Sequence, residues 1–398
     1  MLEVETKVPT AHYPTRHLIL LIDGTWASST KKIARQRYSN IYWLNLFFET
    51  HNSRESTTSQ EAQLSFYIPG LGTWATGTKK YSIGAFASEL ARDVEQAYIN
   101  ICANYTSPYK NDYDELVAGD KIYLFGFSRG AAIAHLVARI ISDYGILHAG
   151  KIELFPRIWR HLVGLEELDV VRFRKDYCTD AEVEFLGVFD TVLGSYRGRD
   201  YEAIKRLFAS ECVLPERVKY ALQILAMDET RQDFRPVLWR NVPKAETRLS
   251  QVWMPGVHTD IGGGYERAAL SRMSLYLMLD YIYEHTTLSL THHRLDELER
   301  EIRKDFEQNL VAINDERAGI WKMLGTLRGG ERKFDPAVCN QFLHPICAAL
   351  VGRSIEYKSE RHPRQYSLQR MTELKDRIMP EEFFDSLRSG TRKPWLVD

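Results

Sequence analysis

The segment Lys121–Ile141, KIYLFGFSRGAAIAHLVARII, decides the fold of this 398-residue chain. Its first seven residues are apolar enough for a buried β-strand, and the alanine-rich run that begins at Ala131 predicts a buried helix. The strand runs directly into the helix, so Ser128 lies in a tight turn between Gly126 and Gly130. A G-x-S-x-G sequence at such a junction is typical of a serine nucleophile held above a sheet.

The rest of the chain repeats this alternation of short apolar strands and amphipathic helices. Further strands are expected at 17–22, 64–68, 183–189 and 248–254, and helices at 82–104, 201–208 and 216–227. Such alternation favours an α/β fold with a mostly parallel sheet and helices on both faces. Together with the G-x-S-x-G turn, it makes an α/β-hydrolase-like fold the expectation. We expect an N-terminal extension at 1–14, the α/β-hydrolase domain at 15–290 and a helical C-terminal cap or appendage at 291–398.

The composition is that of an ordinary globular protein, with 44% hydrophobic and 26% charged residues. Lys and Arg number 52 against 53 Asp and Glu, giving a formal net charge of −1. Because this balance gives no overall attraction to nucleic acid, we expect no nucleic-acid partner. The five cysteines are odd in number and never form a C-x-x-C pair, which favours a reducing compartment.

The sequence contains no run of eighteen apolar residues, so no transmembrane segment is expected. The N-terminus lacks the basic start and apolar core of a secretory signal peptide. We therefore expect a cytoplasmic protein, or one that is exported without a signal peptide. The expected partner is a small-molecule or lipid substrate, with a transient membrane-surface contact left open. The sequence does not indicate a protein partner.

A serine nucleophile needs a general base, and the base needs a carboxylate that orients it. In α/β-hydrolases these follow in the chain order serine, acid, histidine, each after a strand. Asp190 directly follows the strand expected at 183–189, and His258 follows the one at 248–254. The sequence therefore predicts Ser128 as nucleophile, Asp190 as acid and His258 as base, and this chemistry requires no cofactor.

Backbone amides near the nucleophile are the expected donors to a developing oxyanion. One is the amide of the residue after the nucleophile, Arg129, at the start of a helix. The other comes from the loop after an earlier strand. The leading candidate is the turn Asp23–Trp26, with Gly24 and Thr25 as donors, and the second candidate is Gly70–Thr73.

Two alternatives stay open from the residues alone. Asp23, Asp190 and Asp260 could instead hold a hard metal ion for a metal-assisted hydrolase. However, their spacing in the sequence matches no metal-ligand motif, so we expect no metal site. The other alternative is a non-catalytic binding or assembly module on the same fold. The intact serine, acid and histidine candidates argue against it.

Six motifs, taken together, resemble those of one family. They are LIDGTW at 21–26, YIPGLGT at 67–73, GFSRGA at 126–131, GVFDTV at 187–192, AMDETR at 226–231 and GVHTDIGGGY at 256–265. The family is an α/β-hydrolase domain family that includes phospholipase effectors of bacterial type VI secretion. The resemblance covers roughly residues 15–285 and implies a lipid ester as substrate. It implies the same three roles for Ser128, Asp190 and His258. This chain departs from the family in its short connections, since lipolytic members often carry large insertions.

Overall fold

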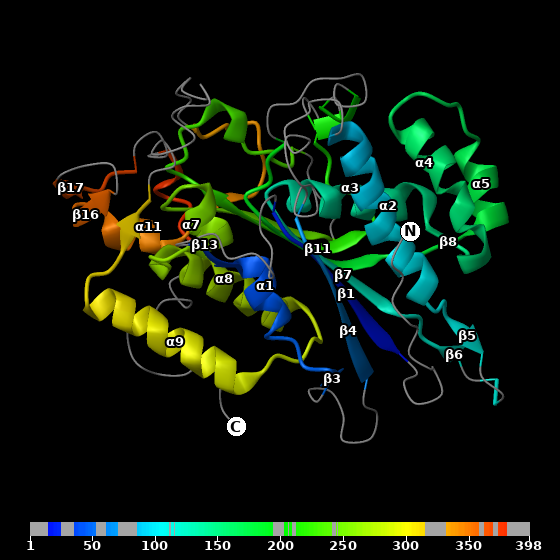
Figure 1. Ribbon diagram of the computed structural model, residues 1–398, viewed down its shortest axis with the longest axis horizontal. Coiled ribbons are helices and arrows are strands. Elements are labelled where there is room, and N and C mark those ends of the chain that lie inside the picture. The colour runs from blue at the N-terminus through cyan, green and yellow to red at the C-terminus, as the bar shows by residue number, and fades with distance from the viewer. Residues whose placement is uncertain are drawn as a thin grey trace.

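An eight-stranded sheet runs through the described part of this computed structural model (Figure 1). Its order is β15-β12-β11-β10-β7-β1-β4-β3; β3 is antiparallel to β4 and every other neighbouring pair is parallel. The strands are β1 Arg16–Ile22, β3 His51–Asn52, β4 Glu61–Ile68, β7 Lys121–Phe127, β10 Val183–Phe189, β11 Val218–Ala226, β12 Arg248–Met254 and β15 Gln341–Leu343. The structure describes residues 15–24, 36–52, 61–70, 86–110, 113–114, 116–193, 203–205, 207–208, 212–240, 244, 246–314, 332–357, 362–368 and 373–379.

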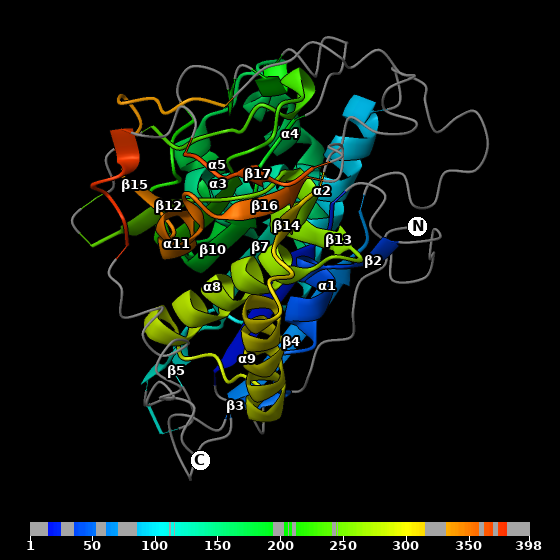
Figure 2. The same ribbon diagram turned by 90° about the vertical axis from the view of Figure 1, so that its left-hand side faces the viewer.

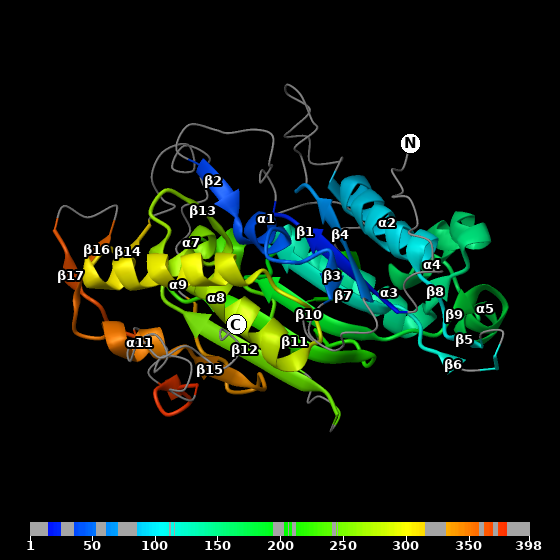
Figure 3. The same cartoon turned by 90° about the horizontal axis from the view of Figure 1, so that it is seen from below.

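Helices cover both faces of this sheet. Successive side chains of a strand point to opposite faces, and in β1 Leu18 and Leu20 pack with α2 and α3, whereas Ile19 and Leu21 pack with α1 and α8. These helices are α1 Asn40–Asn45, α2 Phe86–Asn104, α3 Arg129–Tyr144 and α8 Ala269–His285. Figure 3 shows the layers from below. The predicted α/β fold, with a parallel sheet buried on both sides, is confirmed.

The strand order reverses beside β1. The chain passes from β1 to β4 on one side, returns to β7 on the other, and then adds β10, β11 and β12 outward from β7. Ile22 and Gly126 are paired at the carboxyl ends of β1 and β7. In open α/β sheets, ligands bind at the carboxyl ends of strands where the order reverses. The turn after β1 and the turn after β7 therefore meet at the expected binding crevice.

One predicted element is wrong: the helix expected at 216–227 is the strand β11. Its sequence VKYALQILA is a nearly continuous apolar run, which periodicity alone cannot assign to a helix or a strand. Parallel pairing with both β10 and β12 decides it, because a central strand is buried on both faces. Of the helix expected at 201–208, residues 203–205 and 207–208 are helical.

The C-terminal region contains the helices expected for it and also adds to the sheet. It includes α9 His292–Glu307 and α11 Pro345–Leu350, and its strand β15 pairs with β12. A small sheet of β14 Ala312–Ile313, β16 Ser354–Tyr357 and β17 Arg364–Gln365 completes it. Figures 1 and 3 show this small sheet and α11 at the same end of the molecule as α7 His258–Gly262, and in Figure 2 that side faces the viewer. The N-terminal extension expected at 1–14 lies outside the described residues.

The remaining elements are short. They are β2 Gln36–Ser39, β5 Tyr109–Lys110, β6 Leu116–Val117, β8 Ile146–Leu147, the 3-10 helix Ala149–Leu154, α4 Phe155–Leu162, α5 Val170–Tyr177, β9 Cys178–Thr179, the 3-10 helix Gln232–Phe234 and β13 Gly263–Tyr265. Within the described ranges, no helix combines the length and the apolar character needed to cross a membrane.

Candidate active site

Ser128 occupies a strained turn between β7 and α3. Its φ of 59° and ψ of −122° lie in a region that side-chain-bearing residues rarely adopt. The helix starts very close to β1, because a Cβ added at Gly130 would lie 2.3 Å from the carbonyl oxygen of Ile22. The Ser128 amide also donates to the carbonyl oxygen of Phe189, at a distance of 3.0 Å. The turn is therefore fixed by both strands that flank β7.

The structure brings the three residues predicted to act together into one hydrogen-bonded chain. His258, the first residue of α7, lies with Nε2 2.9 Å from the Ser128 Oγ and Nδ1 2.6 Å from the Asp190 Oδ2. With the proton on Nδ1, the imidazole donates to Asp190 and accepts from the serine hydroxyl. All three side chains are buried, and Ser128 keeps 7% of its surface exposed.

Two aromatic rings hold the imidazole of His258. The Phe127 ring lies 4.7 Å from it at a tilted angle of 31°, and the Phe234 ring lies 4.9 Å away at 70°. Phe127 fits there because a Cβ at Gly262 would overlap its ring, at 1.9 Å. Gly262, in the glycine cluster that follows His258, therefore has a packing role. The backbone amide of His258 donates to the Glu229 Oε2 at 3.3 Å.

The Asp190 carboxylate is fully buried and fully hydrogen-bonded. Oδ1 accepts from the Ala226 amide (3.0 Å) and from Arg332 Nη1 (2.5 Å), while Oδ2 accepts from His258 and from Arg332 Nη2 (2.9 Å). Burial would raise the pKa of this carboxyl, but the Arg332 guanidinium and the hydrogen bond with His258 outweigh it. They hold the pKa of Asp190 well below its ordinary value of 3.8, so the group is ionised at neutral pH.

Arg332 is the residue of this site that sequence reasoning missed. It lies 142 residues after Asp190, in a polar and basic stretch with no motif or spacing that ties it to the sheet. Only the fold brings it to the carboxyl end of β10.

The expected oxyanion donors lie beside the nucleophile where the structure describes them. Arg129 is the first residue of α3, so its amide belongs to the helix N-terminus. A Cβ at Gly24 would lie 3.3 Å from the Cβ of Ser128, which brings the turn after β1 against the nucleophile. The Gly24 amide donates to its neighbour Asp23 at 2.7 Å. Thr25, Trp26 and residues 71–73 of the second candidate loop lie outside the described residues.

The carboxylates considered as alternative metal ligands each accept hydrogen bonds from partners of their own. Asp23 accepts from the hydroxyls of Ser39 and Tyr67, both at 2.6 Å, and burial raises its pKa to about 6 against these hydrogen bonds. Asp260 accepts from the Val257 amide (3.0 Å) at the start of α7 and from the Asn314 side chain (2.6 Å). Among the described residues, no group of three or more His, Cys, Asp or Glu side chains could hold a metal ion. Asp23, Asp190 and Asp260 therefore do not form the site that the metal alternative requires.

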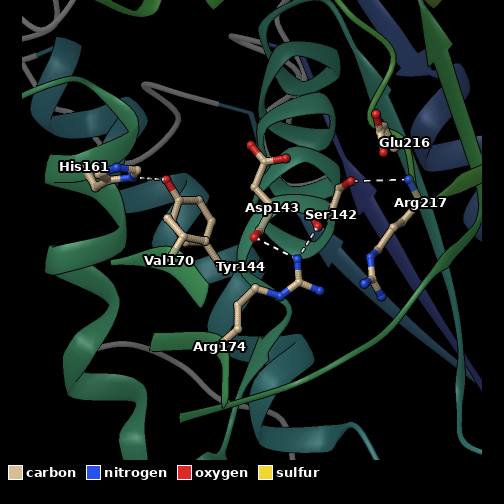
Figure 4. Close-up of a pocket in the computed structure, with 8 residues that line it drawn as sticks. All are labelled: Ser142, Asp143, Tyr144, His161, Val170, Arg174, Glu216 and Arg217. Atoms are coloured by element: carbon tan, nitrogen blue, oxygen red, sulfur yellow. Dashed lines mark hydrogen bonds between the residues drawn. The ribbon is translucent and has the colours of Figure 1, made fainter. Parts of the chain in front are cut away.

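A separate pocket of about 450 Å³ lies at the other end of α3 (Figure 4). There Arg174 donates to the carbonyl oxygens of Ser142 and Asp143, and the Tyr144 hydroxyl lies 2.6 Å from His161 Nδ1. At a helical rise of 1.5 Å per residue, Ser142 is about 21 Å along the helix from Ser128. This pocket is therefore not part of the candidate active site.

Comparison with known protein families gives a match. A family model described as "T6SS, Phospholipase effector Tle1-like, catalytic domain" matches residues 16–281. An uncharacterised protein of Saccharomyces cerevisiae is 26% identical over 264 residues, which cover 59% of this chain and 34% of the yeast protein. The match thus spans about a third of that curated relative.

Two solved structures are also similar in part. One is the Tle1 effector bound to the VgrG spike of the type VI secretion system, at 23% identity and a TM-score of 0.34; the match covers 64% of this chain and 52% of the effector. The other is an uncharacterised protein from Pseudomonas aeruginosa, at 16% identity and a TM-score of 0.40, covering 79% of this chain and 52% of that protein.

Proposed function

This chain belongs to the family of Tle1-like phospholipase effectors, through the catalytic domain at residues 16–281, and we propose that it is a serine hydrolase that cleaves an ester bond of a lipid. The observation that carries the proposal is the chain of hydrogen bonds from Ser128 through His258 to Asp190. The family supports the lipid as substrate class. The nucleophile and its base support attack on an acyl carbon.

In the proposed first half-reaction, the Ser128 Oγ attacks the ester carbonyl while His258 Nε2 takes the hydroxyl proton. The bond between the acyl carbon and the leaving oxygen then breaks, and His258 returns the proton to that oxygen, which leaves as an alcohol. An acyl group stays on Ser128. In the second half-reaction, water attacks the acyl carbon while His258 takes a proton from it; the bond between the acyl carbon and the Ser128 Oγ then breaks, His258 returns the proton to Oγ, and a fatty acid leaves. The ionised Asp190 stabilises the imidazolium that forms in each half.

The negative charge that develops on the carbonyl oxygen needs donors near Ser128. We assign this role to the amide of Arg129, at the N-terminus of α3, and to an amide of the turn after β1, for which Thr25 is the candidate because the Gly24 amide already donates to the Asp23 carboxylate. A helix N-terminus favours an anion because its amides and dipole point outward. The closeness of Gly24 to the nucleophile supports the second donor.

The test is fatty acid release from phosphatidylcholine vesicles and from a short-chain p-nitrophenyl ester. Ser128→Ala removes the nucleophile and is expected to abolish both activities, whereas Ser142→Ala is the matched control. Ser142 is a buried serine on the same helix, about 21 Å away. Hydrolysis of the p-nitrophenyl ester alone would support the serine mechanism and reject the phospholipid. Turnover of either substrate at the wild-type rate by a folded Ser128→Ala protein would reject the mechanism.

A further inference from the structure

The two terminal nitrogens of Arg332, a residue outside the matched catalytic domain, make four hydrogen bonds, while its buried Nε has no partner among the described residues. Its side chain is 3% exposed. Two nitrogens pair with the two oxygens of Asp190, and the same nitrogens donate to the carbonyl oxygens of Ala226 and Phe234, each at 2.6 Å. The planar fork of an arginine matches a carboxylate in this two-point geometry, which a lysine cannot reproduce.

We propose that Arg332 is a positioning residue of the active site, which holds the Asp190 carboxylate in register with His258 and balances its charge. The region from residue 291 onward thereby completes a site whose nucleophile, acid and base all come from the matched domain. This inference rests on the proposed function of those three residues.

The contacts of Arg332 tie together the parts of the site that must keep their relative positions. Asp190 directly follows β10, Ala226 ends β11, and Phe234 carries the ring that packs against His258. Without Arg332, the donors to Asp190 among the described residues are the Ala226 amide and His258 itself. The carboxylate could then rotate, and the hydrogen bond that orients the imidazole would lose its fixed direction.

Two further contacts from the C-terminal region support the same role. Asn314 donates to Asp260, two residues after His258, with its backbone amide (3.1 Å) and its side chain (2.6 Å). The Tyr366 hydroxyl donates to Asp228 (3.2 Å), which also accepts from the Gly256 amide in the loop before His258. Of Asn314, Tyr366 and Arg332, it is Arg332 that contacts the proposed hydrogen-bonded chain directly, at Asp190.

The charged groups around His258 lead to a second prediction, on how the activity depends on pH. The ionisable groups that face it are Asp190 from the end of β10, Glu229 from the loop after β11, Arg231 paired with Glu229, and Arg332. These are two carboxylates and two guanidiniums. Removing the Arg332 charge leaves a net negative charge and takes away the guanidinium that lowers the pKa of Asp190, so the site binds a proton more tightly. The acid limb of the activity profile should therefore move to higher pH.

The experiment compares Arg332→Lys and Arg332→Gln with Arg16→Lys. Arg16 is the matched control because it is also buried, pairs with both oxygens of one carboxylate, Asp120, and contacts the carbonyl oxygen of Asn104. It begins β1, about 20 Å from the carboxyl end of that strand. The readouts are kcat and KM for a short-chain p-nitrophenyl ester between pH 5 and 9, the rate of fluorophosphonate labelling of Ser128, and a thermal melt.

We expect both Arg332 variants to lose about 10- to 100-fold in kcat with KM nearly unchanged, the size of effect that a small misplacement of catalytic groups produces. Labelling of Ser128 should slow in parallel. Arg332→Gln should also move the acid limb to higher pH, whereas Arg332→Lys should keep it. Arg16→Lys should lower the melting temperature without changing the kcat or the pH profile.

The proposal is overturned if folded Arg332→Gln keeps the wild-type kcat and acid limb, or if Arg16→Lys causes the same losses. It is also overturned if Arg332→Lys fails to fold under conditions in which Arg16→Lys folds, because the role is then structural. The proposed function fails separately: in that case wild-type Ser128 itself is not labelled.

Discussion

Replacement of Asp190 by asparagine should remove the negative charge of this residue and keep the shape of its side chain. The amide is nearly isosteric with the carboxylate, so the backbone turn at φ 43° can persist. The charge is lost, however, and an NH₂ group that faces His258 Nδ1 favours the tautomer with its proton on Nε2. The imidazole could then no longer accept the Ser128 proton.

The size of the effect follows from the contacts that are lost. In the worked case of a serine protease, the same change reduces kcat by about 10⁴-fold through the wrong tautomer. We expect a fall of about 10³- to 10⁴-fold here, which corresponds to about 4–5.5 kcal/mol in the activation barrier. The variant also leaves the Arg332 guanidinium buried without its counter-charge, so the free energy of unfolding should fall by about 3–5 kcal/mol.

The assay is kcat for a short-chain p-nitrophenyl ester at pH 8, with urea unfolding of the same samples. Glu229→Gln is the control, since Glu229 is a buried carboxylate that accepts from the backbone amide of His258 at 3.3 Å. We expect it to lower kcat by less than about tenfold, because backbone placement alone changes. A folded Asp190→Asn protein within threefold of the wild-type kcat would refute the reasoning.

Two further predictions concern stability. Gly130→Ala should lower the free energy of unfolding by at least about 1–3 kcal/mol, because its Cβ would lie 2.3 Å from the Ile22 carbonyl oxygen. Urea unfolding measures this change, and an unchanged unfolding midpoint would contradict the close packing of the turn. Burial raises the pKa of Asp23 to about 6 from 3.8, so the folded chain binds that proton more tightly than the unfolded chain does. The stability that this group contributes is complete below pH 4 and is lost as the pH rises through about 6. Asp23→Asn, which cannot titrate, should therefore gain about 2 kcal/mol relative to wild type between pH 4.5 and pH 7.5. A difference that does not vary with pH would contradict the raised pKa.

Much of the sheet could be predicted because its strands are short, apolar and bounded by turn residues. The junction at Ser128 was predictable because strand, glycines and helix follow one another without a break. The order of Asp190 and His258 could also be anticipated, since Asp190 directly follows β10 and His258 lies in the loop shortly after β12. These features are local, and local patterns are what a single sequence displays.

The features that escaped prediction depend on pairing between distant segments. The run in β11 has the composition of a helix or a strand, and its neighbours β10 and β12 decide between them. β15 has three residues, too few for a periodic signal, and is defined by its pairing with β12. Arg332 belongs to no element, and only the return of the C-terminal region over the sheet edge brings it to Asp190.

The central claim is that Ser128 is an activated nucleophile, and covalent labelling with a fluorophosphonate tests it most directly. The probe reacts when the serine oxygen displaces fluoride from phosphorus, which requires a base, the role proposed for His258, whose Nε2 lies 2.9 Å from the Ser128 Oγ. We predict one adduct, located on Ser128 by mass spectrometry of the digested protein, absent in Ser128→Ala and present in Ser142→Ala. A folded wild-type protein that carries no adduct, or carries it on another serine, would contradict the account.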